Sequence, residues 1–95
     1  MKIAEKPLHE LSLQDMAEAL KAVVPAGYAT VTANVDLGGV VVEACCVEIY
    51  VMHDAAGMAI EVECWHPHSV SAFKTLAAAT LDEAIALVAA EFDNS

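Results

Sequence analysis

The sequence contains no arginine, and its strongly basic residues are four lysines. Fourteen acidic residues stand against them, so the net charge at pH 7 is −10 for a chain of 95 residues. Proteins bind nucleic acids directly by replacing phosphate counterions with Lys and Arg, so this balance argues strongly against direct nucleic-acid binding. It argues equally against binding to anionic membranes. A charge of this size steers a protein toward cationic surfaces, and we expect a basic partner.

Cysteine is also scarce, and its positions do not suit disulfide bonds. The three residues are Cys45, Cys46 and Cys64. An odd number with two adjacent residues makes a poor disulfide framework. Reduced thiols are the simplest interpretation, and they predict a cytoplasmic protein. No apolar run approaches the length of a membrane span, and residues 1–11 lack the apolar centre of a signal peptide.

The composition is that of a folded chain rather than a disordered one. Hydrophobic residues make up 58% of it, and the mean hydropathy is +0.53. Disordered segments have low hydrophobicity, so this chain does not belong to their class. Its length suffices for one core, and we predict a single α+β domain over residues 1–95.

Two segments have the apolar spacing of amphipathic helices. The first is predicted over residues 13–24, with Ser12 as N-cap and Asp15 three residues further on. Pro25 ends this helix. The second helix is predicted from Thr80-Leu81-Asp82-Glu83, which has the form of a capping box and places carboxylates in the first turn.

Between the helices, apolar residues recur with a period of two, which is typical of strands with one buried face. Residues 29–37 predict a first strand, and Gly38-Gly39 predicts a two-residue hairpin turn after it. Residues 40–51 predict a second strand, whose apolar phase switches at residues 45–47. A β-bulge there would restore the buried face. Residues 58–65 predict a third strand.

The predicted element order is α-β-β-β-α, a three-stranded antiparallel meander with both helices on one face of the sheet. Residues 67–79 fit either a helical stripe or an extended connection. The second face of the sheet is left to solvent in this arrangement, and it carries the polar phase of the strands.

Carboxylates dominate that polar phase, and no Lys or Arg occurs between residues 28 and 66. A sheet face of one charge repels itself, so it suits a basic partner better than it stabilises the fold. A solvated polar face, general acid/base catalysis and a hard-cation site are the alternatives. The carboxylates of the predicted partner-binding face are Asp36, Glu43, Glu48, Glu61 and Glu63, with Asp54 in a connecting loop.

Tyr50 and Trp65 fall on the same phase as these carboxylates. Aromatic residues surrounded by carboxylates are suitable anchors for an Arg-rich partner, so both join the predicted partner-binding residues. The alternative is that they shield the end of the core.

The segment from Cys64 to His68 contains the second candidate site. In an extended chain Cys64, His66 and His68 share a face, and thiolate with imidazole suits zinc, with His53 as a possible fourth ligand. The spacing matches no common zinc signature, and Cys64 lies on the core phase. The alternative is a buried thiol beside loop histidines, and we predict no catalytic residue, metal or cofactor.

The element order resembles the double-stranded-RNA-binding domain in topology. Such domains place a basic cluster at the start of the last helix, where this chain has Thr80-Leu81-Asp82-Glu83, so the resemblance does not imply RNA binding. The segment 79–84 after a meander is similar to antitoxin domains of the HicB type. In size and charge the chain is similar to small acidic bacteriophage proteins, including anti-CRISPR proteins, several of which imitate DNA. That likeness implies an inhibitor that occupies Lys/Arg-rich channels of nucleic-acid enzymes.

The sequence therefore predicts a non-enzymatic, anti-CRISPR-like inhibitor that occupies a basic, nucleic-acid-binding surface of a partner protein. The first alternative is a self-assembling structural subunit, because the first predicted strand offers an open edge for a homodimer. The second alternative is a metal-binding domain that uses Cys64, His66 and His68.

Overall fold

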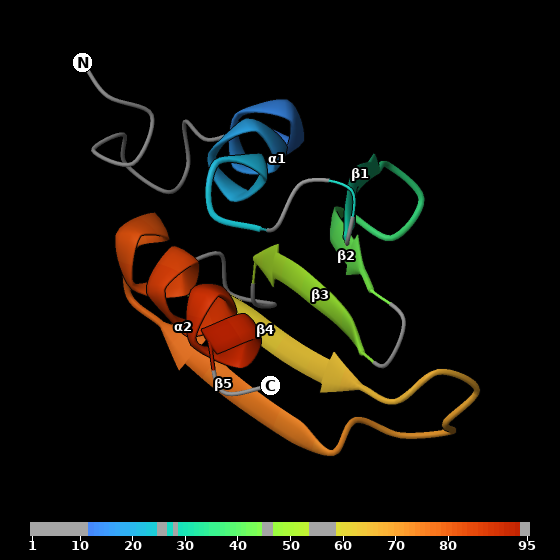
Figure 1. The fold of residues 1–95 in the computed structure, drawn as a ribbon. Coiled ribbons are helices and arrows are strands. Elements are labelled where there is room, and N and C mark those ends of the chain that lie inside the picture. The colour runs from blue at the N-terminus through green and yellow to red at the C-terminus, as the bar shows by residue number, and fades with distance from the viewer. Residues whose placement is uncertain (1–11, 25–26, 28, 45–46, 54–58, 94–95) are drawn as a thin grey trace.

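The computed structural model describes residues 12–24, 27, 29–44, 47–53 and 59–93. The order of elements is α1 (Leu13–Lys21), β1 (Thr30–Asn34), β2 (Gly39–Glu43), β3 (Glu48–His53), β4 (Ile60–Trp65), β5 (Lys74–Ala78) and α2 (Leu81–Asp93). The strands form one antiparallel sheet in the order β1-β2-β3-β4-β5, so each strand pairs with its neighbour in sequence (Figure 1). The predicted α+β class and antiparallel meander are confirmed, but the sheet has five strands where three were predicted.

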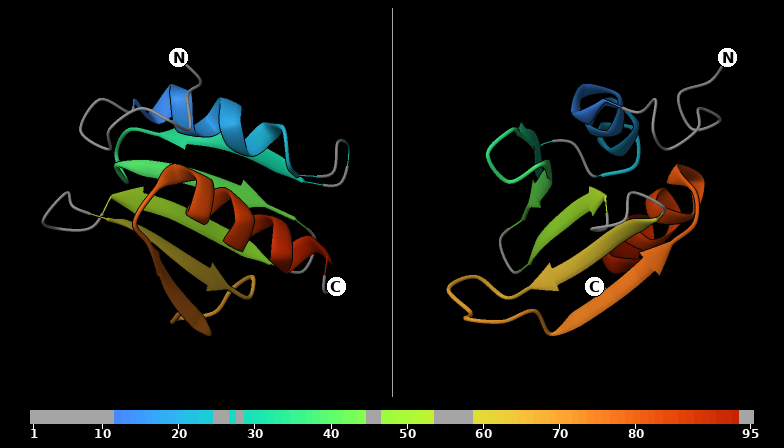
Figure 2. Two further views of the ribbon diagram at one scale, coloured as in Figure 1. Left: turned by 90° about the vertical axis from the view of Figure 1, so that its left-hand side faces the viewer. Right: turned by 180° about the vertical axis from the view of Figure 1, so that it is seen from behind.

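Both helices cover the same face of the sheet (Figure 2). Helix α1 contacts β1 and β2, α2 contacts β4 and β5, and the two helices contact each other above the middle of the sheet. The prediction of one covered face is therefore confirmed. Neither helix of the described ranges is long and apolar enough to cross a membrane.

The core lies between the helices and alternate residues of the three central strands. Val40, Val51 and Val62 are successive partners across β2, β3 and β4, so one row of the sheet is entirely apolar on the covered face. Burial of such side chains stabilises the fold by about 1.5–3 kcal/mol each. The largest fully buried side chains of the core are Met16, Leu20, Val40, Val42, Ile49, Val51, Ile60, Val62, Cys64, Leu81 and Val88.

The segment predicted as one strand over residues 40–51 is two strands. Glu43 is the partner of Glu48 in the β2–β3 pair, and the Ala44 N–H donates to the Val47 carbonyl over 2.9 Å. The chain therefore reverses direction here, and the prediction of a β-bulge is wrong. A reversal and a bulge both switch the apolar phase, and residues 44–47 contain none of the Gly, Pro, Asn or Asp that announce a turn.

Strand β1 ends three residues earlier than predicted, because Asn34 begins a turn. The Asn34 side-chain oxygen accepts from the Leu37 N–H over 3.0 Å, and Gly38 adopts a positive φ of +75°. Val35 and Leu37 were assigned to the buried phase, but 83% and 43% of their surfaces are exposed in this turn. The predicted two-residue turn at Gly38-Gly39 is also wrong, since Gly39 is the first residue of β2.

The ambiguous residues 67–79 include a fifth strand rather than a helix. The Phe73 N–H donates to the Cys64 carbonyl over 2.9 Å, and β5 then pairs with β4 from Lys74 onward. The extended alternative is therefore the correct one. Its residues fit a helical stripe equally well because the segment is short and rich in alanine.

Both predicted helix starts are present with their caps. Ser12 and Asp15 form a reciprocal capping box, with 3.0 Å from the Asp15 N–H to the Ser12 hydroxyl. Thr80 accepts from the Glu83 N–H over 3.2 Å, and the Glu83 carboxylate accepts from the Ala79 N–H. Helix α1 ends at Lys21 rather than at residue 24.

Candidate protein-binding face

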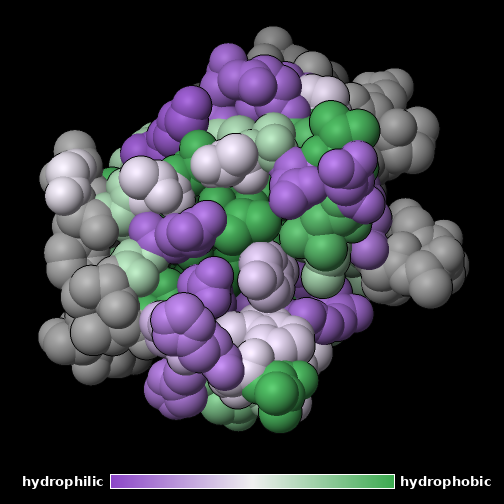
Figure 3. Space-filling model, turned by 90° about the vertical axis from the view of Figure 1, so that its right-hand side faces the viewer, coloured by the Kyte–Doolittle hydropathy of each residue, from purple (hydrophilic) through white to green (hydrophobic). Residues whose placement is uncertain are grey.

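The face of the sheet opposite the helices is the surface on which the predicted site residues fall, and it is called the open face below. Strand alternation and register assign its members. Figure 3 views the molecule from this side and shows hydrophobic and hydrophilic groups interspersed across it. The residues of the open face are Thr30, Thr32, Asn34, Gly39, Val41, Glu43, Glu48, Tyr50, Met52, Glu61, Glu63, Trp65, Thr75 and Ala77.

Four predicted carboxylates lie on the open face, as the alternation predicted. Glu43 is directly opposite Glu48 across β2 and β3. Glu63 is opposite Tyr50, and Glu61 is opposite Met52, across β3 and β4. Opposed residues have Cβ atoms about 4.5–5.5 Å apart, so Glu43 and Glu48 form a pair of close like charges.

Asp36 is not on a strand. It lies exposed in the turn between β1 and β2, because β1 already ends at Asn34. Its assignment to the sheet face is therefore wrong. Asp54 lies outside the described residues.

The two predicted aromatic anchors contact each other. The rings of Tyr50 and Trp65 are 5.8 Å apart between centroids and inclined by 68°, an edge-to-face arrangement. The Trp65 Nε1–H donates to the Glu63 Oε1 over 3.2 Å. Edge-to-face aromatic pairs contribute about 0.5–1.5 kcal/mol beyond burial, so this pair has a defined orientation on the open face.

The carboxylates give the open face a negative potential around Tyr50. Partial burial raises the pKa of the Tyr50 hydroxyl, and the charges of Glu48, Glu43 and Glu63 raise it further, in that order. The phenol therefore stays protonated and keeps a donor available among three carboxylates. A cation placed here would meet all three charges at once.

Within the described ranges, no lysine balances these charges on the open face. Lys21 lies in the last turn of α1. Lys74 turns toward the helices and forms an ion pair of 2.8 Å with Glu91 of α2. The two lysines therefore lie on the covered side of the sheet, and the open face keeps its excess of negative charge.

An apolar patch at the middle of the open face was not predicted from the sequence. Val41 is only 8% exposed although it points away from the helices. Met52 lies over Gly39, where an added Cβ would meet the Met52 Cγ and lie 2.8 Å from the Val51 carbonyl oxygen. The signal was present in the run Val40-Val41-Val42, which is apolar on both phases, and in Gly39, which was interpreted as a turn residue.

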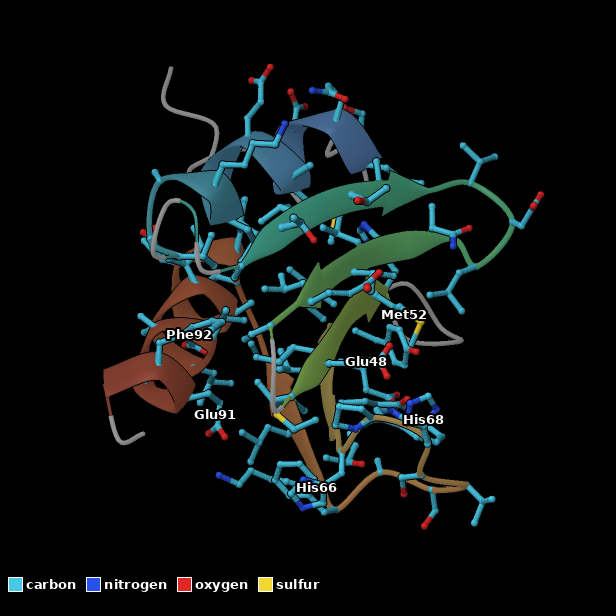
Figure 4. The ribbon with its side chains drawn as sticks, turned by 45° about the vertical axis from the view of Figure 1, so that its right-hand side comes forward. Glu48, Met52, His66, His68, Glu91 and Phe92 are labelled. Carbon is cyan, nitrogen blue, oxygen red and sulfur yellow. The ribbon has the colours of Figure 1, made fainter. Side chains whose placement is uncertain are left out.

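The residues of the suggested metal site do not come together. Cys64 points into the core and is fully buried, and this burial raises the pKa of its thiol. His66 stacks on Phe73 with ring centroids 4.2 Å apart, while His68 lies apart from it in the β4–β5 connection (Figure 4). In the part of the chain that the structure describes, no three His, Cys, Asp or Glu residues form a group able to hold a metal.

In comparisons with known proteins, no family model, curated protein or solved structure matches this chain. The resemblances to RNA-binding domains, HicB-type antitoxins and anti-CRISPR proteins thus have no support from these comparisons.

Proposed function

We propose that this domain is a non-enzymatic protein-binding module whose open face binds a basic surface of a partner protein. The observation that carries the proposal is the opposition of Glu43 and Glu48 beside the Tyr50–Trp65 pair. Like charges directly opposite each other on adjacent strands destabilise a sheet. A cationic partner is attracted by both carboxylates, so the arrangement favours binding although it does not favour folding.

The aromatic and apolar groups of the open face support the same proposal. Protein interfaces are enriched in Tyr, Trp and Met, and they place apolar contacts inside a polar rim. Here the half-buried Met52 supplies apolar area, while Tyr50 and Trp65 offer ring surfaces on which an Arg guanidinium can stack. Specific recognition requires such anchors, because exposed carboxylates alone attract any cation.

The partner most consistent with these features is a nucleic-acid-binding protein. Surfaces that hold a phosphate backbone are rich in Lys and Arg, and they select a dense array of negative charge. In this proposal the domain occupies such a surface and inhibits the partner, as nucleic-acid mimics of the anti-CRISPR kind do. The inhibitory step rests on charge complementarity and not on any shared sequence.

The test is a variant that reverses the sign of the face while keeping the repulsion within it. Glu43→Lys with Glu48→Lys replaces one like-charged pair by another, so we expect folding to be nearly unchanged. The matched control is Gln14→Lys, Glu18→Lys and Ala22→Lys, which gives the same net change on exposed positions of the helical side. Capture from a cell lysate, washed at low and then high salt, compares the wild type, the variant and the control as bait.

We expect the wild type and the control to retain the same basic protein and to release it as salt rises. The recovered partner should also lose nucleic-acid binding when wild-type domain is added. Retention of that partner by the Glu43→Lys/Glu48→Lys variant, with the same salt dependence, would refute the proposal.

A further inference from the structure

Tyr50 lies at the centre of the open face. It belongs to β3, the middle strand of the five, and to the middle one of three rows that the register forms across this face. Successive rows are about 6.5–7 Å apart along a strand, and opposed Cβ atoms are about 4.5–5.5 Å apart, so side chains of all three rows border Tyr50. The rows are Thr30-Glu43-Glu48-Trp65, Thr32-Val41-Tyr50-Glu63-Thr75 and Asn34-Gly39-Met52-Glu61-Ala77.

The surroundings of Tyr50 are acidic on one side and apolar on the other. Its acidic neighbours are Glu43, Glu48 and Glu63, and its apolar neighbours are Val41 and Met52. The same three carboxylates raise the pKa of the Tyr50 hydroxyl after partial burial does, which places their charges close to the ring. A ligand that lies over this ring therefore meets negative charge and apolar surface together.

The contact with Trp65 leaves aromatic surface available. The two rings meet edge to face, inclined by 68°, and in such a pair the ring that presents its edge keeps both of its own faces clear of the other ring. Both residues are only partly buried. The 3.2 Å hydrogen bond from Trp65 to Glu63 holds the indole in place, so the pair forms a fixed aromatic surface beside the carboxylates.

We propose that the open face selects arginine over lysine in its partner, with one guanidinium lying over Tyr50 between the carboxylates of Glu48 and Glu63. This inference rests on the proposed function and names the side chain that the basic partner supplies. A guanidinium is planar and carries five N–H donors, so it stacks on an aromatic ring while it donates to two carboxylates. A lysine ammonium is compact and strongly hydrated, so it pairs with the carboxylates but gains less from the ring.

Charge complementarity favours an arginine of another protein over the other occupants of this face. A second copy of the chain would bring its own carboxylates, and each copy carries a net charge of −10. A bound metal ion is not favoured, because no three His, Cys, Asp or Glu residues of the described ranges form a group able to hold one. The lysines of those ranges, Lys21 and Lys74, lie on the covered side of the sheet.

Two peptides of equal charge, hexa-arginine and hexa-lysine, test this selection. The net charge of the domain attracts both, so a difference between them reports on the side chain. Fluorescence anisotropy of dye-labelled peptides, titrated with the whole chain at low salt, measures the two affinities. We expect wild type to bind hexa-arginine about threefold to tenfold more tightly than hexa-lysine.

Tyr50→Leu removes the ring and keeps every carboxylate, so we expect the two affinities to converge. The matched control is Met52→Leu, a change of similar volume at the next residue of the open face on β3, which should keep the full preference for arginine. Circular dichroism checks that both variants fold. A preference for arginine that survives Tyr50→Leu would overturn the placement of the guanidinium over this ring.

A second pair of variants leaves the aromatic contact unaltered. Glu48→Gln and Glu61→Gln each remove one carboxylate from the open face, and Glu48 is the one whose charge acts on the Tyr50 hydroxyl. We expect Glu48→Gln to reduce the preference for arginine and Glu61→Gln to preserve it. Equal effects of the two changes would contradict the inference.

The peptides also separate this inference from the proposed function. Equal affinities of wild type for both peptides, each lost in Glu43→Lys/Glu48→Lys, would overturn the selection of arginine and leave the basic partner standing. Binding of neither peptide to wild type would overturn both.

Discussion

Glu43 and Glu48 are direct partners on β2 and β3, at the end of the pair where the chain reverses. Two carboxylates in this position repel each other, and neither of the two described lysines lies on their side of the sheet. Tyr50 lies two residues beyond Glu48 on the same face, and its pKa is raised by partial burial and then by both charges. The predictions below follow from this local conflict and from the packing around it.

Reversing one charge of the pair should stabilise the fold. Glu48→Lys places an ammonium opposite Glu43, and we expect a gain of about 0.2–1 kcal/mol in the free energy of unfolding. Urea denaturation followed by circular dichroism measures it. The control Glu18→Lys makes the same charge change on exposed α1, where it loses an attraction to Lys21 and should give no gain. A Glu48→Lys protein less stable than wild type would contradict this account.

The hydroxyl of Tyr50 should make stability depend on pH in the alkaline range. Its pKa in the folded protein is raised above the ordinary 10.0, so the unfolded chain loses this proton first. The contribution of the Tyr50 hydroxyl to the free energy of unfolding is fully present below about pH 10. It is lost as the pH rises through the pKa of this hydroxyl in the folded protein. Tyr50→Phe removes the group, so its unfolding free energy should fall less steeply there than that of wild type.

Urea denaturation of both proteins between neutral pH and the alkaline limit gives the two slopes. Tyr28 and the lysines are common to both proteins, so the difference between the slopes isolates Tyr50. Coincident slopes would show that neither burial nor the carboxylates raise the pKa of this hydroxyl.

Gly39 should not tolerate a side chain. An added Cβ meets the Met52 Cγ and lies 2.8 Å from the Val51 carbonyl oxygen, so we expect Gly39→Ala to cost about 1–3 kcal/mol of stability. Adding Met52→Ala removes the flexible obstacle but leaves the carbonyl, so the double variant should recover only part of the extra cost. Equilibrium unfolding of the single and double variants forms the cycle. Simple additivity of the two changes would exclude the contact between these residues.

Cys64 should be unreactive in the folded protein. Its side chain is fully buried, and burial followed by the charge of Glu91 raises the pKa of its thiol, against a smaller lowering by Lys74. Thiolate is the reacting form, so alkylation requires unfolding. The reactivity of Cys64 is measured by iodoacetamide labelling of a Cys45→Ser/Cys46→Ser variant with and without urea, followed by mass spectrometry. Labelling of native protein at the rate of a free thiol would contradict the placement of Cys64 in the core.

Sequence patterns predicted the helices, the buried phase and the faces of the central carboxylates, because each depends on local periodicity. Ser12 and Asp15 indicate the start of α1, because a capping box is a local pattern. The alternation around Glu61 and Glu63 predicts their face of the sheet without any tertiary information. The reversal between Glu43 and Glu48 was missed because no Gly, Pro, Asn or Asp marks it. This reversal accounts for one of the two strands that were not predicted. The other is β5, which lies in residues 67–79, where the spacing fits a helix and an extended chain equally well.

The candidate site was predictable in membership but not in arrangement. Alternation placed Tyr50 and Trp65 on one face, but their contact depends on the register of β3 against β4, which the sequence does not encode locally. The position of Asp36 was predicted wrongly because the side chain of Asn34 begins the turn earlier than the apolar pattern indicates. The apolar patch at Met52 could not be predicted, because it depends on which residue lies opposite Gly39.

Binding of a cationic peptide, followed through Trp65, tests the role of the open face most directly. Trp65 is the one tryptophan of the chain, so its fluorescence reports on the open face alone. We expect an arginine-rich peptide to give a saturable change at low salt that weakens as salt rises. The Gln14→Lys/Glu18→Lys/Ala22→Lys control should respond as wild type does, and Glu43→Lys/Glu48→Lys should not respond. An equal response of the sign-reversed variant, or none from wild type, would contradict the account.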